Sequence, residues 1–296
     1  MSTNDSPSLL GRVSDAQAVR AITEATHRTR ETRRRVDWAS LVDRAVLVGM
    51  AALGLACPQG AGLWYRAFAV ALLGLWATVL GAAALVTLIS ERQGERLQGP
   101  RRKPALIARE VRTTMLSAWI AASLLAWPLA RLWSGKPTGL VWDLEQAGGG
   151  VLIFSQTFAA LFVLDAWLYW KHRLLHTRAL FGFHRDHHAF RDPTAFAGFA
   201  VGPVEALLTF WPIVFLALPE AIHYGPLYLS LVIGFVVLNL YLHCGVSVRF
   251  IEASLPRLFL NTSVFHNRHH ANAEVNFGEA FTIWDHLCRT REQDQG

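Results

Sequence analysis

The residues of this chain most able to do chemistry are histidines, and they are grouped. Five of the twelve histidines fall within residues 171–188: His172, His176, His184, His187 and His188. Three more lie near the end of the sequence: His266, His269 and His270. Residues three or four apart lie on one face of a helix, so each group can direct its imidazole rings to one place. Convergent imidazoles predict a metal site.

The residue type alone does not choose the metal, because imidazole suits iron, copper, nickel and zinc. With His243, up to nine ring nitrogens are available, more than a single ion coordinates, so we expect two ions. Haem fits less well, since it needs only two axial ligands. A zinc peptidase is disfavoured because no H-E-x-x-H motif is present. A membrane zinc-dependent hydrolase and a non-catalytic metal-binding membrane protein stay open as alternatives.

The composition indicates that these histidines are positioned by membrane helices. The chain has 296 residues, of which 52% are hydrophobic and only 17% charged, and its mean hydropathy is +0.28. The three cysteines are widely spaced, which argues against a disulfide framework and against a zinc-thiolate site. The fold class that we expect is all-α: a polytopic transmembrane bundle with a cytosolic helical cap that carries a histidine-rich di-metal site.

Apolar stretches near the length that a helix needs to cross a bilayer predict the spans. They are residues 40–57, 67–89, 114–133, 149–170, 203–221 and 225–243. The fifth contains Pro203, Pro212 and Pro219, so the last two could form a shallow re-entrant hairpin instead of two crossings. We therefore expect four to six spans.

The basic residues predict the orientation of these spans. If the N-terminus is cytosolic, all but three of the 28 lysines and arginines lie in cytosolic segments, the exceptions being Arg66, Arg131 and Lys136. This satisfies the positive-inside rule and explains the net charge of +6 without nucleic acid as a partner. The same topology places the three histidine groups and His243 on the cytosolic side and His223 on the other.

In order and spacing, the three histidine groups resemble the three histidine boxes of the fatty acid hydroxylase/sterol desaturase superfamily. The resemblance covers about residues 150–291 and extends to residues around the boxes: Asp165, Tyr169, Pro203, Glu205, Asn276-Phe277-Gly278 and Trp284-Asp285. His243 stands where the family usually has a further ligand. Two positions depart from the pattern: Gly202 stands where the family has histidine, and Cys288-Arg289-Thr290 replaces a Gly-Thr ending.

The resemblance implies a non-haem di-iron oxygenase that uses O2 to hydroxylate or desaturate a lipid such as a fatty acyl chain or sterol, and we favour hydroxylation. It implies two iron ions bound by nine histidines: His172, His176, His184, His187, His188, His243, His266, His269 and His270. Carboxylates would orient the ring N–H groups. Asp165, on the same helix face as His172, is our first candidate for that catalytic role. Asp186 and Asp285 follow.

The predicted organisation has three parts: a basic cytosolic tail over 1–38, an N-terminal transmembrane region over 39–148 and the catalytic domain over 149–291. The sequence carries no haem, flavin or ferredoxin motif, so we expect a separate electron-donor protein, of cytochrome b5 type or a ferredoxin with its reductase. The excess of arginine over lysine indicates a GC-rich genome. We therefore expect a bacterial inner membrane rather than endoplasmic reticulum.

Overall fold

The computed structural model describes residues 37–93, 95–98 and 104–292. The chain divides into two units, Met1–Leu41 and Val42–Gly296. Of the first unit only residues 37–41 are described, so almost all of the predicted basic tail lies outside the described residues. The fold and all the candidate metal ligands belong to the second unit.

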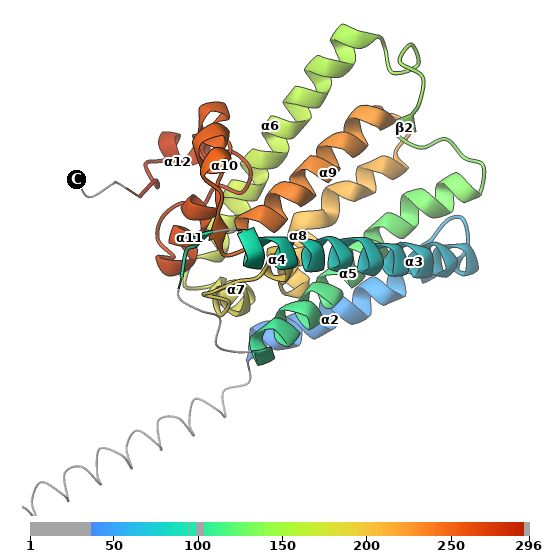
Figure 1. Ribbon diagram of the computed structural model, residues 1–296. Coiled ribbons are helices and arrows are strands. Elements are labelled where there is room, and N and C mark those ends of the chain that lie inside the picture. Colours follow the sequence, from blue (N-terminus) through green and yellow to red (C-terminus); the bar gives the residue numbers. More distant parts are fainter. Residues whose placement is uncertain (1–36, 94, 99–103, 293–296) are drawn as a thin grey trace, which may run out of the picture. The chain divides into compact units, whose positions relative to one another are not determined.

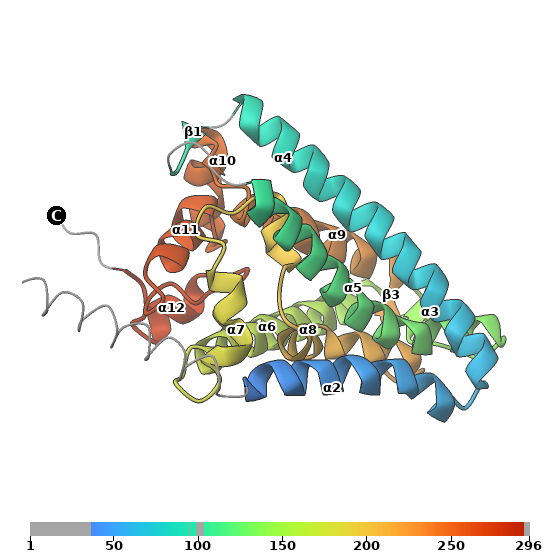
Figure 2. The ribbon, with the colours of Figure 1, turned by 90° about the horizontal axis from the view of Figure 1, so that it is seen from below.

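Long apolar helices dominate the described residues, as Figure 1 shows. They are α2 (Trp38–Ala52), α3 (Ala61–Leu75), α4 (Gly81–Gln93), α5 (Pro104–Trp133), α6 (Gly150–Leu175) and α9 (Gly225–Leu242). The π-helical segment η2 (Trp76–Leu80) joins α3 to α4 in one continuous apolar rod (Figure 2). In the described part of the chain, five stretches are long and apolar enough to cross a membrane. The prediction of an all-α polytopic protein with four to six spans is confirmed.

The predicted span over 203–221 has a different form. It consists of α8 (Pro203–Phe210) followed by the 3-10 helix η4 (Trp211–Ala217), and is shorter than the five long stretches. Pro212 has no backbone N–H to continue an α-helical pattern, and Leu218 is already extended, just before Pro219. At about 1.5 Å per α-helical residue and 2.0 Å per 3-10 residue, the pair reaches roughly 26 Å, near the thickness of a hydrocarbon core.

Two short strand pairs show which loops lie together. Strand β2 (Leu140–Val141), after α5, pairs with β3 (His223–Tyr224), after η4. Strand β1 (Glu95–Arg96), after α4, pairs with β4 (Val246–Ser247), after α9. The chain therefore leaves the β2–β3 end along α6 and returns to it along α8 and η4. The segment 203–217 completes this return, so it is not a hairpin that stays at one end.

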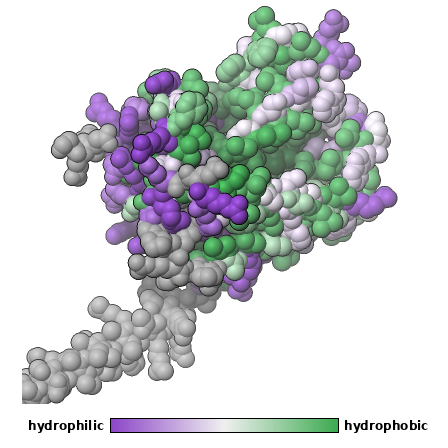
Figure 3. Space-filling model, in the orientation of Figure 1, coloured by the Kyte–Doolittle hydropathy of each residue, from purple (hydrophilic) through white to green (hydrophobic). Residues whose placement is uncertain are grey.

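The end of the bundle near β1 and β4 carries the short helices of the cap. These are α7 (Phe181–His188), the 3-10 helix η3 (Ala195–Phe199), α10 (Arg249–Ser254), η5 (Leu255–Leu258), α11 (Ser263–Ala271) and α12 (Ile283–Leu287). Arg96 of β1 forms a 2.7 Å ion pair with Asp192, which follows α7. In Figure 3, hydrophilic residues gather over this end, and hydrophobic residues cover the sides of the long helices.

Helix α5 fixes the position of the segment that follows α7. Thr114 Oγ1 donates a 2.7 Å hydrogen bond to the carbonyl of Phe196 in η3, and the buried carboxylate of Glu110 accepts from the hydroxyl and backbone N–H of Thr194. Small residues such as Ala122 and Ala126 line the buried face of α5 and allow α3 to approach closely. A firmly packed α5 thus anchors the loop beside the histidines.

Candidate metal centre

Four segments carry the nine candidate ligands to one place. The last turns of α6 carry His172 and end at His176, and α7 carries three histidines on its buried side and C-terminus. His243 ends α9, and α11 carries the remaining three. The side chain of Thr262 caps the N-terminus of α11 by accepting from Phe265 N, which sets where that helix begins.

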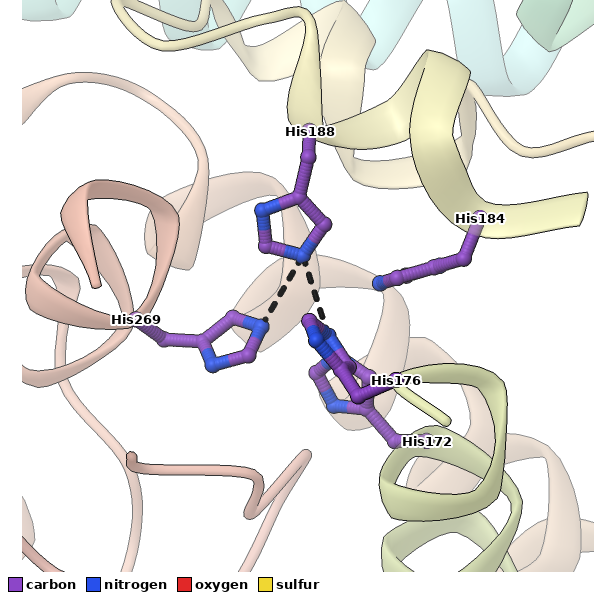
Figure 4. A group of neighbouring side chains, drawn as sticks. All are labelled: His172, His176, His184, His188 and His269. Carbon is purple, nitrogen blue, oxygen red and sulfur yellow. Dashed lines mark hydrogen bonds between the residues drawn. The ribbon is translucent and has the colours of Figure 1, made fainter. Parts of the chain in front are cut away.

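Five histidines form the first group: His172, His176, His184, His188 and His269. One ring nitrogen of each lies within 4.8 Å of the others. Figure 4 shows the rings converging from α6, α7 and α11. The Nε2 atom of His188 lies 3.1 Å from the Nε2 atom of His176 and 3.1 Å from that of His269. This group unites all three sequence motifs.

Four histidines form the second group: His187, His243, His266 and His270, all of them buried. Their potential ligand atoms also lie within 4.8 Å of one another. The Nε2 atom of His266 is 2.9 Å from that of His243 and 3.2 Å from that of His270. The groups adjoin, since the ring centroids of His188 and His270 are 5.1 Å apart.

The chemistry of these nitrogens fits bound metal. Imidazole nitrogens with lone pairs directed at one point repel one another unless a proton or a cation lies between them. The buried Nε2 atoms of His172 and His184 have no hydrogen-bond partner. Burial, with the neighbouring His269 ring, lowers the pKa of His176 to about 3, and burial beside His269 and His176 lowers the pKa of His188 to about 2. Neutral imidazoles are the form that binds metal.

The other ring nitrogen of four histidines is held by an acceptor. The Nδ1–H groups of His172, His269 and His243 donate to the backbone carbonyls of Phe277, Val275 and Asn239, at 2.9, 2.7 and 3.0 Å. That of His184 donates to the Glu205 carboxylate at 2.7 Å. A donating Nδ1 leaves Nε2 as the ligand atom and fixes the direction in which it points.

Glu205 is the carboxylate that contacts a candidate ligand most closely. It is buried, and the ammonium of Lys171 lies 3.7 Å from its second oxygen. Lys171 also lies 3.4 Å from Glu279, whose same oxygen is 3.6 Å from His172 Nδ1. A buried Lys171 thus links two carboxylates that flank two histidines of the first group.

Asp165, the predicted catalytic carboxylate, makes different contacts. It accepts hydrogen bonds from the backbone N–H groups of Ala280 and Phe281, both at 3.2 Å, and from Trp284 Nε1 at 2.8 Å. Asp285 accepts from the backbone N–H groups of Phe277 and Gly278. These aspartates hold the loop whose backbone carbonyls accept hydrogen bonds from His172 and His269. They therefore position the two rings indirectly, through that loop.

Asp186 is half exposed and pairs with Arg109 and Arg185, away from the rings. Sequence reasoning assigned no role to Glu205, the carboxylate that holds His184. The signal that could have identified it was its position in the Pro-x-Glu motif inside an apolar stretch, where an ionisable residue needs a partner. His223 lies in β3, at the other end of the bundle, as the topology predicted.

Gly202, the departure from the family pattern, faces Asp43 of α2. A β-carbon at this glycine would lie 3.3 Å from an oxygen of the Asp43 carboxylate. Gly202 is the N-cap residue of α8 and has no side chain to offer, and Asp43 instead accepts a 2.9 Å hydrogen bond from Val204 N. A carboxylate from another helix thus caps the helix that carries Glu205.

A small cavity of about 30 Å³ adjoins both histidine groups. Its lining includes five of the candidate ligands, the polar residues Lys171, Glu205, Thr209, Asn239 and Glu279, and the apolar residues Leu168, Phe199, Val201, Phe210 and Phe235. A larger cavity, of about 320 Å³, lies near β3 and includes none of the nine candidate ligands in its lining. The small cavity is the one placed for chemistry at the metal centre.

Comparison with known proteins agrees with this geometry. Residues 157–290 match the family model described as fatty acid hydroxylase. The chain is 32% identical to the lathosterol oxidase of Rattus norvegicus over 140 residues, which are 47% of this chain and 46% of that protein. It is 29% identical to the Delta(7)-sterol 5(6)-desaturase ERG3A of Gibberella zeae over 196 residues, 63% of this chain and 53% of that protein.

A third relative is the sphingolipid C4-hydroxylase sur2 of Schizosaccharomyces pombe, 31% identical over 143 residues, 46% of this chain and 47% of that protein. The chain thus spans about half the length of the curated relatives that it matches. No solved structure matches it.

Proposed function

We propose that this chain is a multi-pass membrane enzyme that oxidises a lipid with O2. The premise is that it belongs, through residues 157–290, to the fatty acid hydroxylase/sterol desaturase superfamily. In this proposal each histidine group holds one iron ion. The observation that carries it is the pair of adjoining groups, in which imidazole nitrogens converge at the cap end of an apolar bundle.

The protein's own residues hold and orient the metal centre. Bound iron would supply the reduction of O2 and the oxidation of an unactivated C–H bond. The nine imidazoles bind the ions as neutral ligands, and Glu205 and the carbonyls of Asn239, Val275 and Phe277 fix the ring directions. Burial of the rings excludes bulk water from the reacting atoms.

A lipid is the substrate class that suits this position. The long helices expose hydrophobic side chains such as Phe158 and Phe162 of α6 and Ile233 of α9, where acyl chains would surround them. The cavity beside the histidines has an apolar half, formed by side chains such as Phe199 and Phe235. The similar proteins are named for sterols and sphingolipids, and we propose a substrate from these classes or a fatty acyl lipid, with hydroxylation favoured over desaturation.

Two further parts of the proposal concern the surroundings of the enzyme. We propose that a separate protein supplies the electrons, docking on the cap end of the bundle. We also propose that this end is cytosolic, because the positive-inside rule places it there. The three similar proteins named above come from eukaryotes, so the expectation of a bacterial inner membrane draws no support from them.

The experiment that tests this function combines metal analysis with lipid mass spectrometry. The purified chain should contain two iron ions. Cells that express it should gain a lipid with one added oxygen atom or two fewer hydrogen atoms, and cells expressing His269→Ala should not. Two bound zinc ions with an O2-independent hydrolytic activity would replace this proposal with the hydrolase. Unchanged lipids in cells that contain iron-loaded protein would favour a non-catalytic role.

A further inference from the structure

An asparagine in the cavity beside the metal centre has an acceptor without a partner. Asn239 is 7% exposed and lies one turn before His243 on α9. Its amide Nδ2 donates a 2.8 Å hydrogen bond to the carbonyl of Gly198 in η3. Because a carbonyl only accepts, this bond fixes which end of the amide is which. The remaining atom, Oδ1, is buried and has no hydrogen-bond partner.

Gly198 leaves space on this acceptor. A β-carbon built at Gly198 would lie 3.3 Å from Asn239 Oδ1 and 3.1 Å from the Asn239 carbonyl oxygen. Any side chain at this position would crowd the amide and cover Oδ1. The glycine thus permits two things together: the close approach of η3 to α9, and an uncovered amide oxygen.

Lys171 and Thr209, polar residues of the same cavity that are not candidate metal ligands, are already engaged. Lys171 contacts Thr209, Glu205 and Glu279, and Thr209 donates to the backbone carbonyl of Glu205. Buried polar groups in proteins are almost always paired, so this acceptor is available to a donor that enters the cavity, either a water molecule or a group of a ligand. This acceptor lies in a cavity that histidines of both groups also line.

We propose that Asn239 is a substrate-binding residue whose Oδ1 accepts a hydrogen bond from a hydroxyl group of the lipid. The substrate class is then a lipid alcohol, in which an O–H group lies near the carbon that reacts. This inference rests on the proposed function and adds a specificity rule to it. A site built to receive a hydroxyl group rejects the analogue that lacks it more strongly than an apolar pocket rejects a change of size.

The test measures binding, so that it does not depend on turnover. Metal-loaded full-length protein in detergent is titrated with two matched pairs: cholesterol and cholest-5-ene, and 1-octadecanol and octadecane. The preference is the ratio of the Kd of the hydrocarbon to the Kd of the alcohol. Preferences are compared between protein variants in the same detergent, so that the unequal partitioning of the lipids into micelles cancels.

Three variants make the comparison specific. Asn239→Leu removes the acceptor, and Gly198→Ala covers it while leaving Asn239 in place. Val237→Leu is the matched control, because it alters an exposed apolar residue of the same helix that does not line the cavity. Unchanged metal content shows that a variant is folded. Should Asn239→Leu fail to fold, Gly198→Ala provides the same comparison.

For at least one pair, Asn239→Leu and Gly198→Ala should lower the preference about tenfold below that of the wild-type protein and of Val237→Leu, the effect of one buried hydrogen bond. Equal preferences in wild type and both variants would overturn the proposal and leave water as the partner of Oδ1. A preference that depends on Asn239 in a protein that oxidises no lipid would uphold the binding residue and reject the function. Lipid oxidation by a protein without an Asn239-dependent preference would uphold the function and reject Asn239 as a substrate-binding residue.

Discussion

Replacing Glu205 by glutamine is the sharpest test of how this centre is held together. Glutamine keeps the size of the side chain and can still accept from His184 Nδ1, now 2.7 Å from a carboxylate oxygen. What it loses is the ability to carry a negative charge, which the ammonium of Lys171, 3.7 Å away, favours and burial opposes. Hydrogen bonds to charged groups stabilise by about 1.5–3 kcal/mol and neutral ones by about 1 kcal/mol, so the change should cost roughly 1–2 kcal/mol of metal binding. That corresponds to a roughly 5- to 30-fold weaker site.

The loss should fall on one ion of the two. His184 belongs to the five-histidine group, whereas none of the four-histidine group contacts Glu205 through a hydrogen bond in the described residues. Metal stoichiometry measured by plasma mass spectrometry during titration with a chelator should therefore show one ion released early and the other at the wild-type chelator concentration.

Asp186→Asn is the matched control for this variant. It makes the same carboxylate-to-amide change on α7, the helix that carries His184, at a half-exposed side chain paired with Arg109 and Arg185. Its release curve should match that of the wild-type protein. If Glu205→Gln retained both ions as tightly as the wild type, or released both together, the carboxylate would not be what orients His184.

The remaining predictions concern the two groups, their supports and the pH. His187→Ala and His269→Ala should each lower the iron content by about one ion per chain and abolish lipid oxidation; retention of two ions in either would separate that residue from the centre. Asp165→Ala leaves three donors without an acceptor and should lower the free energy of unfolding by about 3 kcal/mol in denaturant titrations, with Asp165→Asn less affected. Asp43→Ala removes the cap of α8 and should cost about 1 kcal/mol in the same assay. Burial lowers the pKa of rings such as His176, to about 3, in the folded protein. Below pH 6.5 the unfolded metal-free chain therefore binds more protons than the folded one, and the free energy of unfolding should decrease by about 1.4 kcal/mol for each such histidine with every pH unit that the pH is lowered. A metal-free protein equally stable at pH 7 and pH 5 would contradict this.

Helical periodicity predicts that the histidines within each sequence group converge, because residues four apart share a face wherever the helix lies, and the basic residues predict that the groups share one side of the membrane. It could not divide the nine into five and four. His187 and His188 are adjacent in sequence yet belong to different groups, since successive residues on a helix point in directions about a quarter-turn apart. The division depends on where α7 packs, which is a tertiary property.

The supporting carboxylates show the same limit. The sequence favours Asp165 because it shares a helix face with His172. In the structure its carboxylate binds the loop over 280–284 instead of an imidazole ring, and spacing along a helix does not distinguish these two outcomes. The partner of His184 lies 21 residues further on, in a separate helix. Hydropathy does not decide whether the segment 203–217 crosses the membrane, because it depends only on the number of apolar residues. The length of the segment also depends on the 3-10 winding around Pro212, which has a larger rise per residue than an α-helix.

The order of the candidate ligands along the chain determines the order in which the two histidine groups are completed during synthesis. Four of the five histidines of the first group lie between His172 and His188, and the fifth, His269, comes 81 residues after His188. At about 5–20 residues per second, a ribosome needs roughly 4–16 s to supply it. Until His243 is made, at the end of the last span, the nascent chain offers four of the five histidines of the first group and only His187 of the second. The first ion can therefore be captured while the last span is still unmade, and the second only after it.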